Sequence, residues 1–303
     1  MQPVLVILDG AGDRPQPALQ KAARIAQAFD APLDIWVNAY VPALRQAARF
    51  EQSLQQAAKT HLKERWQKCI QDTLGDDAVI AEVEFSKDPS AAIRHRIIET
   101  DPQLVVVHTS DENTLKRHLM TPRDWKLIRK APCPVLCVHD TPWADQPKMV
   151  AAVDPGSIDE EDLLSARVVS AAKRYALALN GNLQAVHVME KLDETLILIG
   201  GETVPEYARN VDALRDHHRD NFQRFAEGQG IPLEQQVLLE GHVAPTLARF
   251  CDIQEVDIMV VGTVQRNLAE RLLLGATAET VITQSPRDVL IIKPEGFRTP
   301  WLS

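Results

Sequence analysis

The sequence predicts an α/β protein made of two tandem domains, each a doubly wound parallel sheet of five strands with helices on both faces. Three observations lead to this prediction. The chain has 303 residues, which suits two domains, and its composition of 45% hydrophobic and 25% charged residues is that of a globular protein. Strand-like apolar runs alternate with helix-like periodic segments, a pattern typical of parallel sheets. The whole pattern then occurs twice.

The repeat is visible in segments that match at one common spacing. Three segments of the first half match the second half 154 residues later: Leu104–His108 with Ile258–Gly262, Cys133–Val138 with Arg287–Ile292, and Lys87–Pro89 with Gly241–Val243. The opening strands, which end in Asp9 and Asp154, match 145 residues apart. The second copy therefore carries about nine more residues than the first before its fourth strand, and an internal duplication is indicated.

The elements follow the same order in both halves. In the first half we expect strands near 4–8, 33–38, 79–85, 103–107 and 135–138, and a long helix over 44–74. In the second half we expect strands at 149–153, 183–189, 235–239, 257–261 and 289–292, and helices at 164–179, 206–228, 244–251 and 275–283. The segment Asn180-Gly181-Asn182 is expected to end the helix before it through a left-handed residue.

These elements define the domain boundaries. The first domain is expected over residues 1–140 and the second over 148–303, joined by a linker at 141–147 that is rich in proline and polar residues. Right-handed crossovers give doubly wound sheets, which place ligands at the carboxyl ends of the strands near the point where strand order reverses. Asp9, Asp154 and Gly262 fall at this edge.

The loop after the fourth strand of the second half, residues 262–279, is the most informative stretch. Gly262 follows a buried strand, and Gly275 opens the next helix, where free N–H groups and the helix dipole favour phosphate. Arg266 lies between them, in a loop of a length that suits a triphosphate. Asp154, which ends the first strand of this half, is placed to accept a hydrogen bond from an adenine amino group or a ribose hydroxyl.

A strand that ends in Val-Asp, followed late in the domain by a loop of the form Gly-x-x-Gly-x9-Gly-Ser/Thr, resembles the universal stress protein family. The resemblance covers nearly the whole chain, twice, and the segment Thr121–Lys130 resembles the family's tandem-domain branch. It implies a Rossmann-like fold and an adenine nucleotide, such as ATP with Mg²⁺. The implied contacts in the second half are Asp154, Val188, Gly262, Arg266, Gly275, Ala276 and Thr277.

Two departures from the motif weaken this site, and the first half departs further. Gln265 stands where the middle glycine belongs, and Ala276 stands where the final Ser/Thr belongs, although Thr277 follows. In the first half, His108, Asp111 and Thr121 replace the three glycines, Pro122 replaces the hydroxyl residue and Asn38 replaces the valine. We therefore expect a degenerate phosphate loop in the first half and weakened nucleotide binding in the second.

The favoured function is that of a non-catalytic regulatory protein of stress resistance, as the resemblance implies. The alternative is slow ATP hydrolysis or nucleotide transfer in the second domain, through Asp154, Gly262, Arg266 and Gly275 with Mg²⁺ bridging the phosphates. A third alternative, an apolar or lipid-like ligand, has no specific support. The resemblance also implies an internal pseudo-dimer of the two domains, formed along the strands Val135–Val138 and Val289–Ile292, and leaves room for a homodimer and an unknown protein partner.

Composition and motifs argue against several other classes. The net charge of −9 argues against a general nucleic-acid binder, and no apolar run approaches the roughly 20 residues of a membrane helix. The chain opens directly into a strand, without an export signal, so its four cysteines are expected to be reduced in a cytoplasm. The sequence contains no nucleophile elbow and no Walker loop. Gly10 and Gly12 follow the first strand, but they lack the spacing of a dinucleotide-binding fingerprint. No catalytic residue is therefore assigned.

The histidines and cysteines leave one choice open. Cys133 and Cys137 lie on one face of a strand, with His108 and His139 nearby as further zinc ligands, but the spacing matches no standard motif and favours buried thiols. His187 is expected to be a core histidine with a satisfied ring nitrogen. The pair His217-His218 is expected to be solvated on a charged helix face.

Overall fold

The computed structural model describes residues 1–10, 12, 16–41, 52–75, 81–109, 122–155, 159–190, 206–263 and 276–302. The described residues form two compact units. The first contains those up to 142 together with 298–302, and the second contains those from 143 to 297. Each unit is described by itself below.

The first unit is a parallel five-stranded sheet with the strand order β3-β2-β1-β4-β5. Its elements are β1 (Val4–Asp9), α1 (Pro17–Ala28), β2 (Leu33–Asn38), α3 (Gln52–Leu74), β3 (Glu82–Glu84), α4 (Pro89–Thr100), β4 (Leu104–His108), α5 (Pro122–Lys130) and β5 (Val135–Val138). Central strands such as β1 and β4 are buried at almost every residue, as expected for a parallel sheet covered on both faces.

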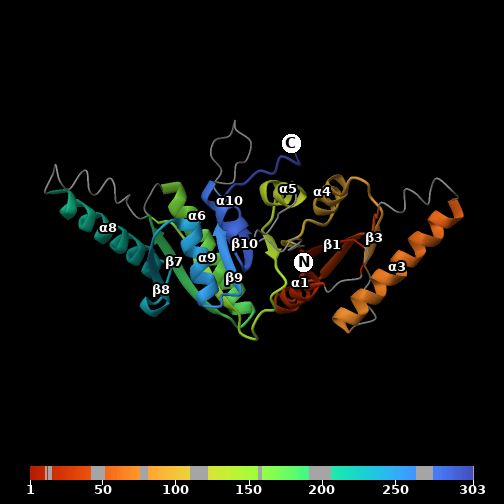
Figure 1. Cartoon of the computed structure of the whole chain (residues 1–303), viewed down its shortest axis with the longest axis horizontal. Helices are drawn as coiled ribbons and strands as arrows, with labels where there is room; N and C mark the ends of the chain where they lie inside the picture. The colour runs from red at the N-terminus through yellow and green to blue at the C-terminus, as the bar shows by residue number, and fades with distance from the viewer. Residues whose placement is uncertain are drawn as a thin grey trace. The chain divides into compact units, whose positions relative to one another are not determined.

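The second unit repeats this architecture with the strand order β8-β7-β6-β9-β10 (Figure 1). Its elements are β6 (Lys148–Ala152), α6 (Asp159–Ala178), β7 (Asn182–Met189), α8 (Glu206–Gly228), a short 3₁₀ turn (Leu233–Gln235), β8 (Gln236–Glu240), α9 (Val243–Ile253), β9 (Ile258–Gly262), α10 (Ala276–Gln284) and β10 (Asp288–Ile292). The predicted fold class is therefore confirmed in both halves. Of the long helix predicted over 44–74, residues 44–51 lie outside the described part of the chain.

The offset of 154 residues reappears in the hydrogen bonds. After β4, the backbone N–H and the hydroxyl of Thr109 both donate to the Val138 carbonyl, at 2.9 and 3.0 Å. After β9, Thr263 makes the same two bonds to the Ile292 carbonyl, at 3.0 and 3.3 Å. Both threonines are buried, so each locks the end of its fourth strand onto the fifth in the same way.

The strand registers show where the extra residues of the second copy enter. In the first unit Val4 pairs with Leu33, whereas in the second unit Met149 pairs with Leu183. The first crossover is thus five residues longer in the second unit. The remaining four of the nine extra residues enter after the second strand.

The end of α6 and the start of β7 need a glycine. Asn180 is left-handed, with φ of 52°, as predicted for the end of this helix. A Cβ on Gly181 would lie 2.5 Å from the backbone oxygen of Pro147, and the neighbouring Asn182 N–H donates to that same oxygen at 2.9 Å. Since the oxygen is part of the backbone, this close approach leaves no room for a side chain at Gly181.

A second device anchors the segment before β6. The carboxylate of Asp257 accepts hydrogen bonds from the backbone N–H groups of Ala144 and Lys148, at 3.2 and 2.8 Å. The indole N–H of Trp143 donates to Asp288 at 2.8 Å. Residues 143–148 are thereby tied to the second unit at the amino ends of β9 and β10.

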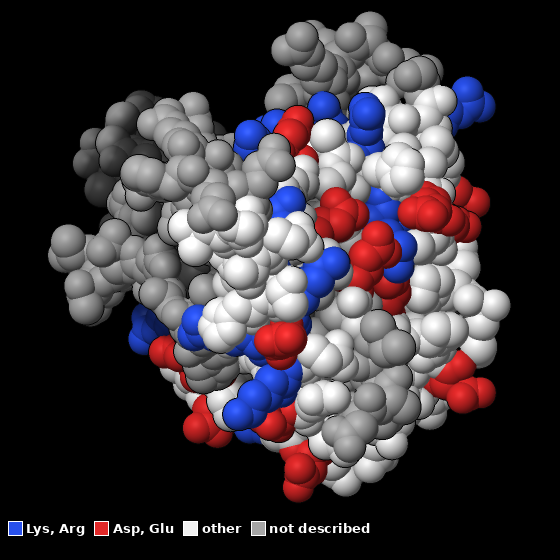
Figure 2. Space-filling model, turned by 90° about the vertical axis from the view of Figure 1, so that its right-hand side faces the viewer, with Lys and Arg blue, Asp and Glu red and all other residues white. Residues whose placement is uncertain are grey.

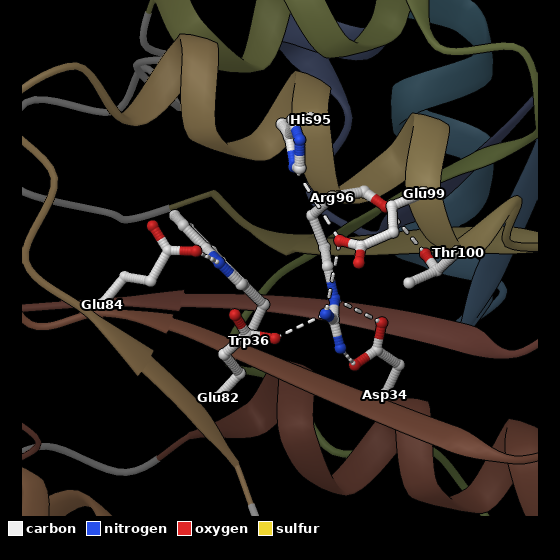
Figure 3. A network of polar contacts seen from close by, with 8 residues as sticks. All are labelled: Asp34, Trp36, Glu82, Glu84, His95, Arg96, Glu99 and Thr100. Carbon is white, nitrogen blue, oxygen red and sulfur yellow. Dashed lines mark hydrogen bonds and ion pairs between the residues drawn. The ribbon is translucent and has the colours of Figure 1, made fainter.

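An ionic network holds the outer strands of the first unit (Figure 3). Arg96 of α4 donates twice to the carboxylate of Asp34 on β2, at 3.0 and 2.6 Å, and lies 2.5 Å from an oxygen of Glu82 on β3. The hydrogen bonds to Asp34 raise the pKa of Arg96, and the charges of Asp34, Glu82 and Glu99 add to this effect against partial burial. The network joins α4 to two strands at their amino ends, opposite the edge where ligands are expected.

The last described residues of the chain belong to the first unit. Residues 298–302 cluster with it, and the hydroxyl of Thr299 donates to the Lys130 carbonyl at the end of α5, at 2.6 Å. Thr299 is buried. The first unit is therefore built from two separate stretches of the sequence.

Candidate functional site

The carboxyl edge of the second sheet brings three of the predicted residues together. β6 lies between β7 and β9, so Asp154 after β6, Val188 near the end of β7 and Gly262 at the end of β9 lie along one edge of the sheet. Asp154 has 71% of its side chain exposed, whereas Val188 is buried. This edge is the point where the strand order reverses, the usual ligand position in such sheets.

The other predicted residues follow β9 in the sequence. Arg266 and Gly275 lie outside the described residues. Ala276 and Thr277 are the first two residues of α10, so they stand at a helix N-terminus, as expected. Their roles in ligand binding remain predictions.

The backbone at Asp154 is fixed by the first helix of its unit. Its N–H donates to the hydroxyl of Ser165 on α6 at 3.2 Å, and Ser165 is buried. One carboxylate oxygen lies 3.6 Å from Nδ1 of His187 on β7. The carboxylate thus projects from a backbone held by α6 and lies beside an imidazole.

Gly262 has a reason for being glycine that does not involve a ligand. A Cβ there would lie 2.7–2.9 Å from three carbons of the Leu164 side chain on α6. The sequence pattern predicts close approach of a ligand at this glycine. The structure shows a close approach by the protein's own leucine, so packing alone accounts for the residue.

His187 is a buried ring with a partner at each nitrogen. Nδ1 lies 3.1 Å from the carbonyl oxygen of Val153, and Nε2 lies 3.4 Å from Nδ1 of His218 on α8. Burial lowers the pKa of His187, and the nearby His218 lowers it further, while the Val153 carbonyl and the charge of Asp154 oppose the change. The prediction of a core histidine with a satisfied nitrogen is confirmed.

The prediction for His218 was wrong. Its ring is half-buried and stacks on His187, with the ring centroids 5.6 Å apart and the planes 26° apart. His217 is exposed, as predicted, and bonds to Asn221 at 2.9 Å. The helical charge pattern identifies the outer face of α8, but it does not show that His218 turns toward a strand residue 31 positions earlier.

At the corresponding edge of the first unit, Asp9 is engaged by a cation. Arg123, the second residue of α5, donates to the Asp9 carboxylate and, at 3.3 Å, to Asp124. Burial alone would lower the pKa of Arg123, but the charges of Asp9 and Asp124 outweigh it and raise that pKa. The sequence analysis missed Arg123, although it lies 154 residues before Thr277, where the second unit has a short hydroxyl side chain instead.

The other two positions at this edge are also engaged. Asn38, at the place of Val188, accepts from the Ser86 N–H at 3.0 Å and donates back to the Ser86 carbonyl at 3.2 Å. His108, at the place of Gly262, lies 2.8 Å from an oxygen of Asp140. Asp9, Asn38 and His108, which stand in the places of Asp154, Val188 and Gly262, therefore each have an intramolecular partner in the first unit.

The glycines after β1 serve packing against α3. The indole N–H of Trp66, which is fully buried, donates to the Gly10 carbonyl at 3.2 Å. A Cβ on Gly12 would lie 3.1 Å from the same indole. Gly12 has φ of 68°, a conformation that L side chains rarely adopt, so this glycine is accounted for without a dinucleotide.

The zinc alternative receives no support from the described part of the chain, which contains no group of three or more His, Cys, Asp or Glu residues able to hold a metal ion. Cys133 and Cys137 are buried thiols, and His108 is bound to Asp140. The backbone oxygen of His139 accepts a hydrogen bond from the buried ammonium of Lys21 at 2.8 Å.

The charges on one face of the molecule are mixed. Figure 2 shows Lys and Arg side chains interspersed with Asp and Glu side chains, and among the described residues neither sign forms a continuous field over this face. Nucleic-acid binders commonly present a one-signed basic surface, which the described residues of this face do not form. Within the described ranges, no helix combines the length and apolar character needed to cross a membrane.

Comparison with known proteins decides the family. The model of the universal stress protein family matches residues 1–139 and again 148–293. The chain belongs to the universal stress protein family. Universal stress protein E of Photorhabdus laumondii is 27% identical over 307 residues, covering 99% of this chain and 97% of that protein. Universal stress protein E of Escherichia coli K12 is 31% identical over 215 residues, covering 70% and 67%.

Solved structures agree on the fold. A crystal structure from Pseudomonas aeruginosa UCBPP-PA14 superposes with a TM-score of 0.70 at 24% identity, covering 97% of this chain and 94% of that chain. A universal stress protein from Archaeoglobus fulgidus superposes with a TM-score of 0.59 at 16% identity. The chain is thus a tandem universal stress protein, with two family domains, that resembles universal stress protein E.

Proposed function

We propose that this tandem universal stress protein is a non-catalytic, cytoplasmic regulatory protein whose second unit binds an adenine nucleotide weakly and whose first unit binds none. The observation that carries the proposal is the contrast between two equivalent carboxylates. Asp154 is 71% exposed at the switch point of the second sheet, whereas Asp9, which is 53% exposed, is paired with Arg123 in the first. The second carboxylate is therefore the more exposed of the two, and a ligand at the first would have to compete with Arg123.

The predicted contacts of the second unit divide between the two ends of the nucleotide. Asp154 accepts from the adenine amino group or the ribose, and the backbone at Val188 borders the base. The amides at the start of α10, with Gly275, Ala276 and Thr277, and the side chain of Arg266 face the phosphates and their Mg²⁺. Gln265 and Ala276 weaken this end, because a side chain replaces a glycine and a hydroxyl is lost.

In the first unit, one of the protein's own side chains takes up the contacts that the nucleotide would need. Arg123 approaches from the N-terminus of α5, the place that a phosphate would take, and binds the carboxylate that the adenosine would need. Asp111 and Glu112, in the loop before this helix, add like charges to the phosphates. A domain of this kind keeps the fold of the family without its ligand.

In this proposal the bound nucleotide acts by shifting a conformational population of the second unit, which a protein partner reads. The internal pseudo-dimer expected along Val135–Val138 and Val289–Ile292, and a homodimer of the whole chain, remain proposals. The chemistry of the protein partner is left open.

Thermal melting with MgATP tests the proposal. Binding to the native state at ten times Kd stabilises it by about 1.4 kcal/mol, which raises the melting temperature of a unit of this size by roughly 3–6 °C. We expect this rise in the wild-type chain, its loss in Asp154→Asn and its retention in the matched variant Asp9→Asn. Each rise is measured from that variant's own melting temperature without nucleotide.

Three results would count against the proposal. No rise at saturating MgATP would remove nucleotide binding altogether. Equal losses in Asp154→Asn and Asp9→Asn would place the ligand in both units. Release of phosphate that depends on Asp154 would instead support the alternative of slow ATP hydrolysis.

A further inference from the structure

The contacts of His187 fix the direction of a chain of hydrogen bonds. A carbonyl oxygen only accepts, so Nδ1 of His187 carries the hydrogen that it donates to Val153 at 3.1 Å. In the neutral ring Nε2 is then an acceptor, so Nδ1 of His218 must carry the hydrogen that bridges the 3.4 Å between the two rings. The chain runs from α8 through β7 to the end of β6, one residue before Asp154.

Among the residues that the structure describes, few other charged groups lie near this pair. Asp154, after β6, lies 3.6 Å from Nδ1 of His187. On β8, the residue paired with His187 is the apolar Leu238. Arg215 of α8 is already paired with Glu240 at the end of β8, at 2.9 Å.

The apolar ring of Phe222, also on α8, packs against His187, with the ring centroids 5.7 Å apart. His217 meets His218 edge-on from the solvent side, with the centroids 6.4 Å apart. Among the described residues, the two rings themselves and Asp154 therefore have the strongest influence on the protonation of the pair.

We propose that His187 and His218 make the nucleotide site of the second unit sensitive to protons, because proton uptake by the pair draws the Asp154 carboxylate onto His187 and releases the His187–His218 bond. This inference rests on the proposed nucleotide function only where it concerns affinity. The behaviour of the histidine pair can be tested without any nucleotide.

The geometry predicts two different effects of two protons. A proton on Nε2 of His218 leaves Nδ1 as the donor, so the bond between the rings is kept. A second proton, on Nε2 of His187, turns two N–H groups toward each other across 3.4 Å and breaks that bond. The imidazolium of His187 then attracts Asp154, which becomes a poorer acceptor for the donors of an adenosine group.

The first unit supplies the matched control. Trp36 pairs with Ile7 as Val186 pairs with Ala152, and one step further along each strand Val37 stands in the place of His187. His187→Val therefore gives the second unit the residue that the first unit already uses in an equally buried strand position. His218→Phe keeps a ring for stacking but removes the donor.

The first test uses the protein alone. The pKa of the buried His187 is lowered in the folded state, so the unfolded chain takes up the proton first and the protein loses stability as the pH drops below about 6.5. Between pH 7.5 and 5.5 the unfolding constant of the wild type should rise about twofold more than that of His187→Val, because folded His187 is itself largely protonated at the lower pH. Histidine NMR signals should show His187 and His218 titrating in two coupled steps, and His187 titrating in one step in His218→Phe. Equal pH dependence of unfolding in wild type and His187→Val, or independent titration of the two rings, overturns the inference.

The second test measures MgATP affinity by calorimetry at pH 7.5 and 5.5. Phosphate groups titrate near pH 6, but this effect is common to all variants and cancels in the ratio. The wild type should lose about fivefold or more affinity beyond the loss seen in His187→Val. If the ratio of Kd at pH 5.5 to Kd at pH 7.5 is the same in both proteins, the link between the histidine pair and the nucleotide site is refuted. Absence of MgATP binding at pH 7.5 refutes the proposed function, and the first test then decides the behaviour of the histidine pair on its own.

Discussion

Gly181→Ala isolates one close contact on which the second unit depends. The added methyl group would lie 2.5 Å from the Pro147 backbone oxygen, whereas ordinary van der Waals contact begins at 3.4 Å. The oxygen cannot rotate away as the tip of a side chain would, because it belongs to the backbone and accepts the Asn182 N–H. The backbone must therefore move by close to an ångström at the point where β6 and β7 begin to pair.

The cost of this movement has two parts. Overpacking in a closely packed region costs about 1–3 kcal/mol, and loss of the bond from Asn182 to Pro147 adds about 1 kcal/mol. A total of about 2–4 kcal/mol lowers the melting temperature of a domain of this size by roughly 4–16 °C. The matched control is Gly228→Ala, since nothing lies within 4 Å of a Cβ there and the residue ends α8.

Both variants are measured by calorimetric or circular-dichroism melting of the full chain. Gly228→Ala should be neutral or slightly stabilising, because alanine favours a helix by up to about 1 kcal/mol over glycine. If Gly181→Ala melts within 1 °C of Gly228→Ala, the inferred contact with Pro147 is wrong.

Two further predictions concern other parts of the molecule. Arg96→Ala should lower the free energy of unfolding by about 2 kcal/mol, because the charge-assisted bonds to Asp34 are lost, and Arg96→Lys should recover less than half because lysine lacks the planar fork. Arg219→Ala, which removes an exposed pair, should change it by under about 0.5 kcal/mol in the same denaturant titrations, and equal effects of the two alanine variants would contradict the argument. Burial raises the pKa of the Cys251 thiol to about 12. In thiol labelling at pH 8, Cys251 should therefore react only after unfolding, and later than the half-buried Cys69. Rapid labelling of Cys251 in the native protein would contradict this description of its environment.

The parts of the fold that follow from local patterns were predictable. Continuous apolar runs such as Leu104–His108 mark strands buried on both faces, and their repetition at one spacing marks the duplication. The left-handed Asn180 follows from the local turn signal in the same way. Patterns of this kind need only neighbouring residues, which a single sequence supplies.

The features that depend on distant residues were not predictable. Arg123 reaches Asp9 across 114 positions, and His218 reaches His187 across 31. Leu164 fills the space beside Gly262, although a glycine after a strand gives the same signal whether a ligand or a side chain approaches it. Such pairings depend on the rotation of each helix about its own axis as it packs on the sheet. Helical periodicity in the sequence fixes this rotation only to within roughly one residue.

Because residues 298–302 belong to the first unit, the repeat that comes first in the sequence is the second to be completed. As the polypeptide leaves the ribosome, the amino-terminal sheet is translated first, yet the threonine that closes the end of α5 emerges only after the whole second sheet. The earlier repeat therefore reaches its final form only after the later one has been synthesised. A premature stop codon after residue 297 would consequently damage the repeat that was translated first, and would leave the one beside the cut intact.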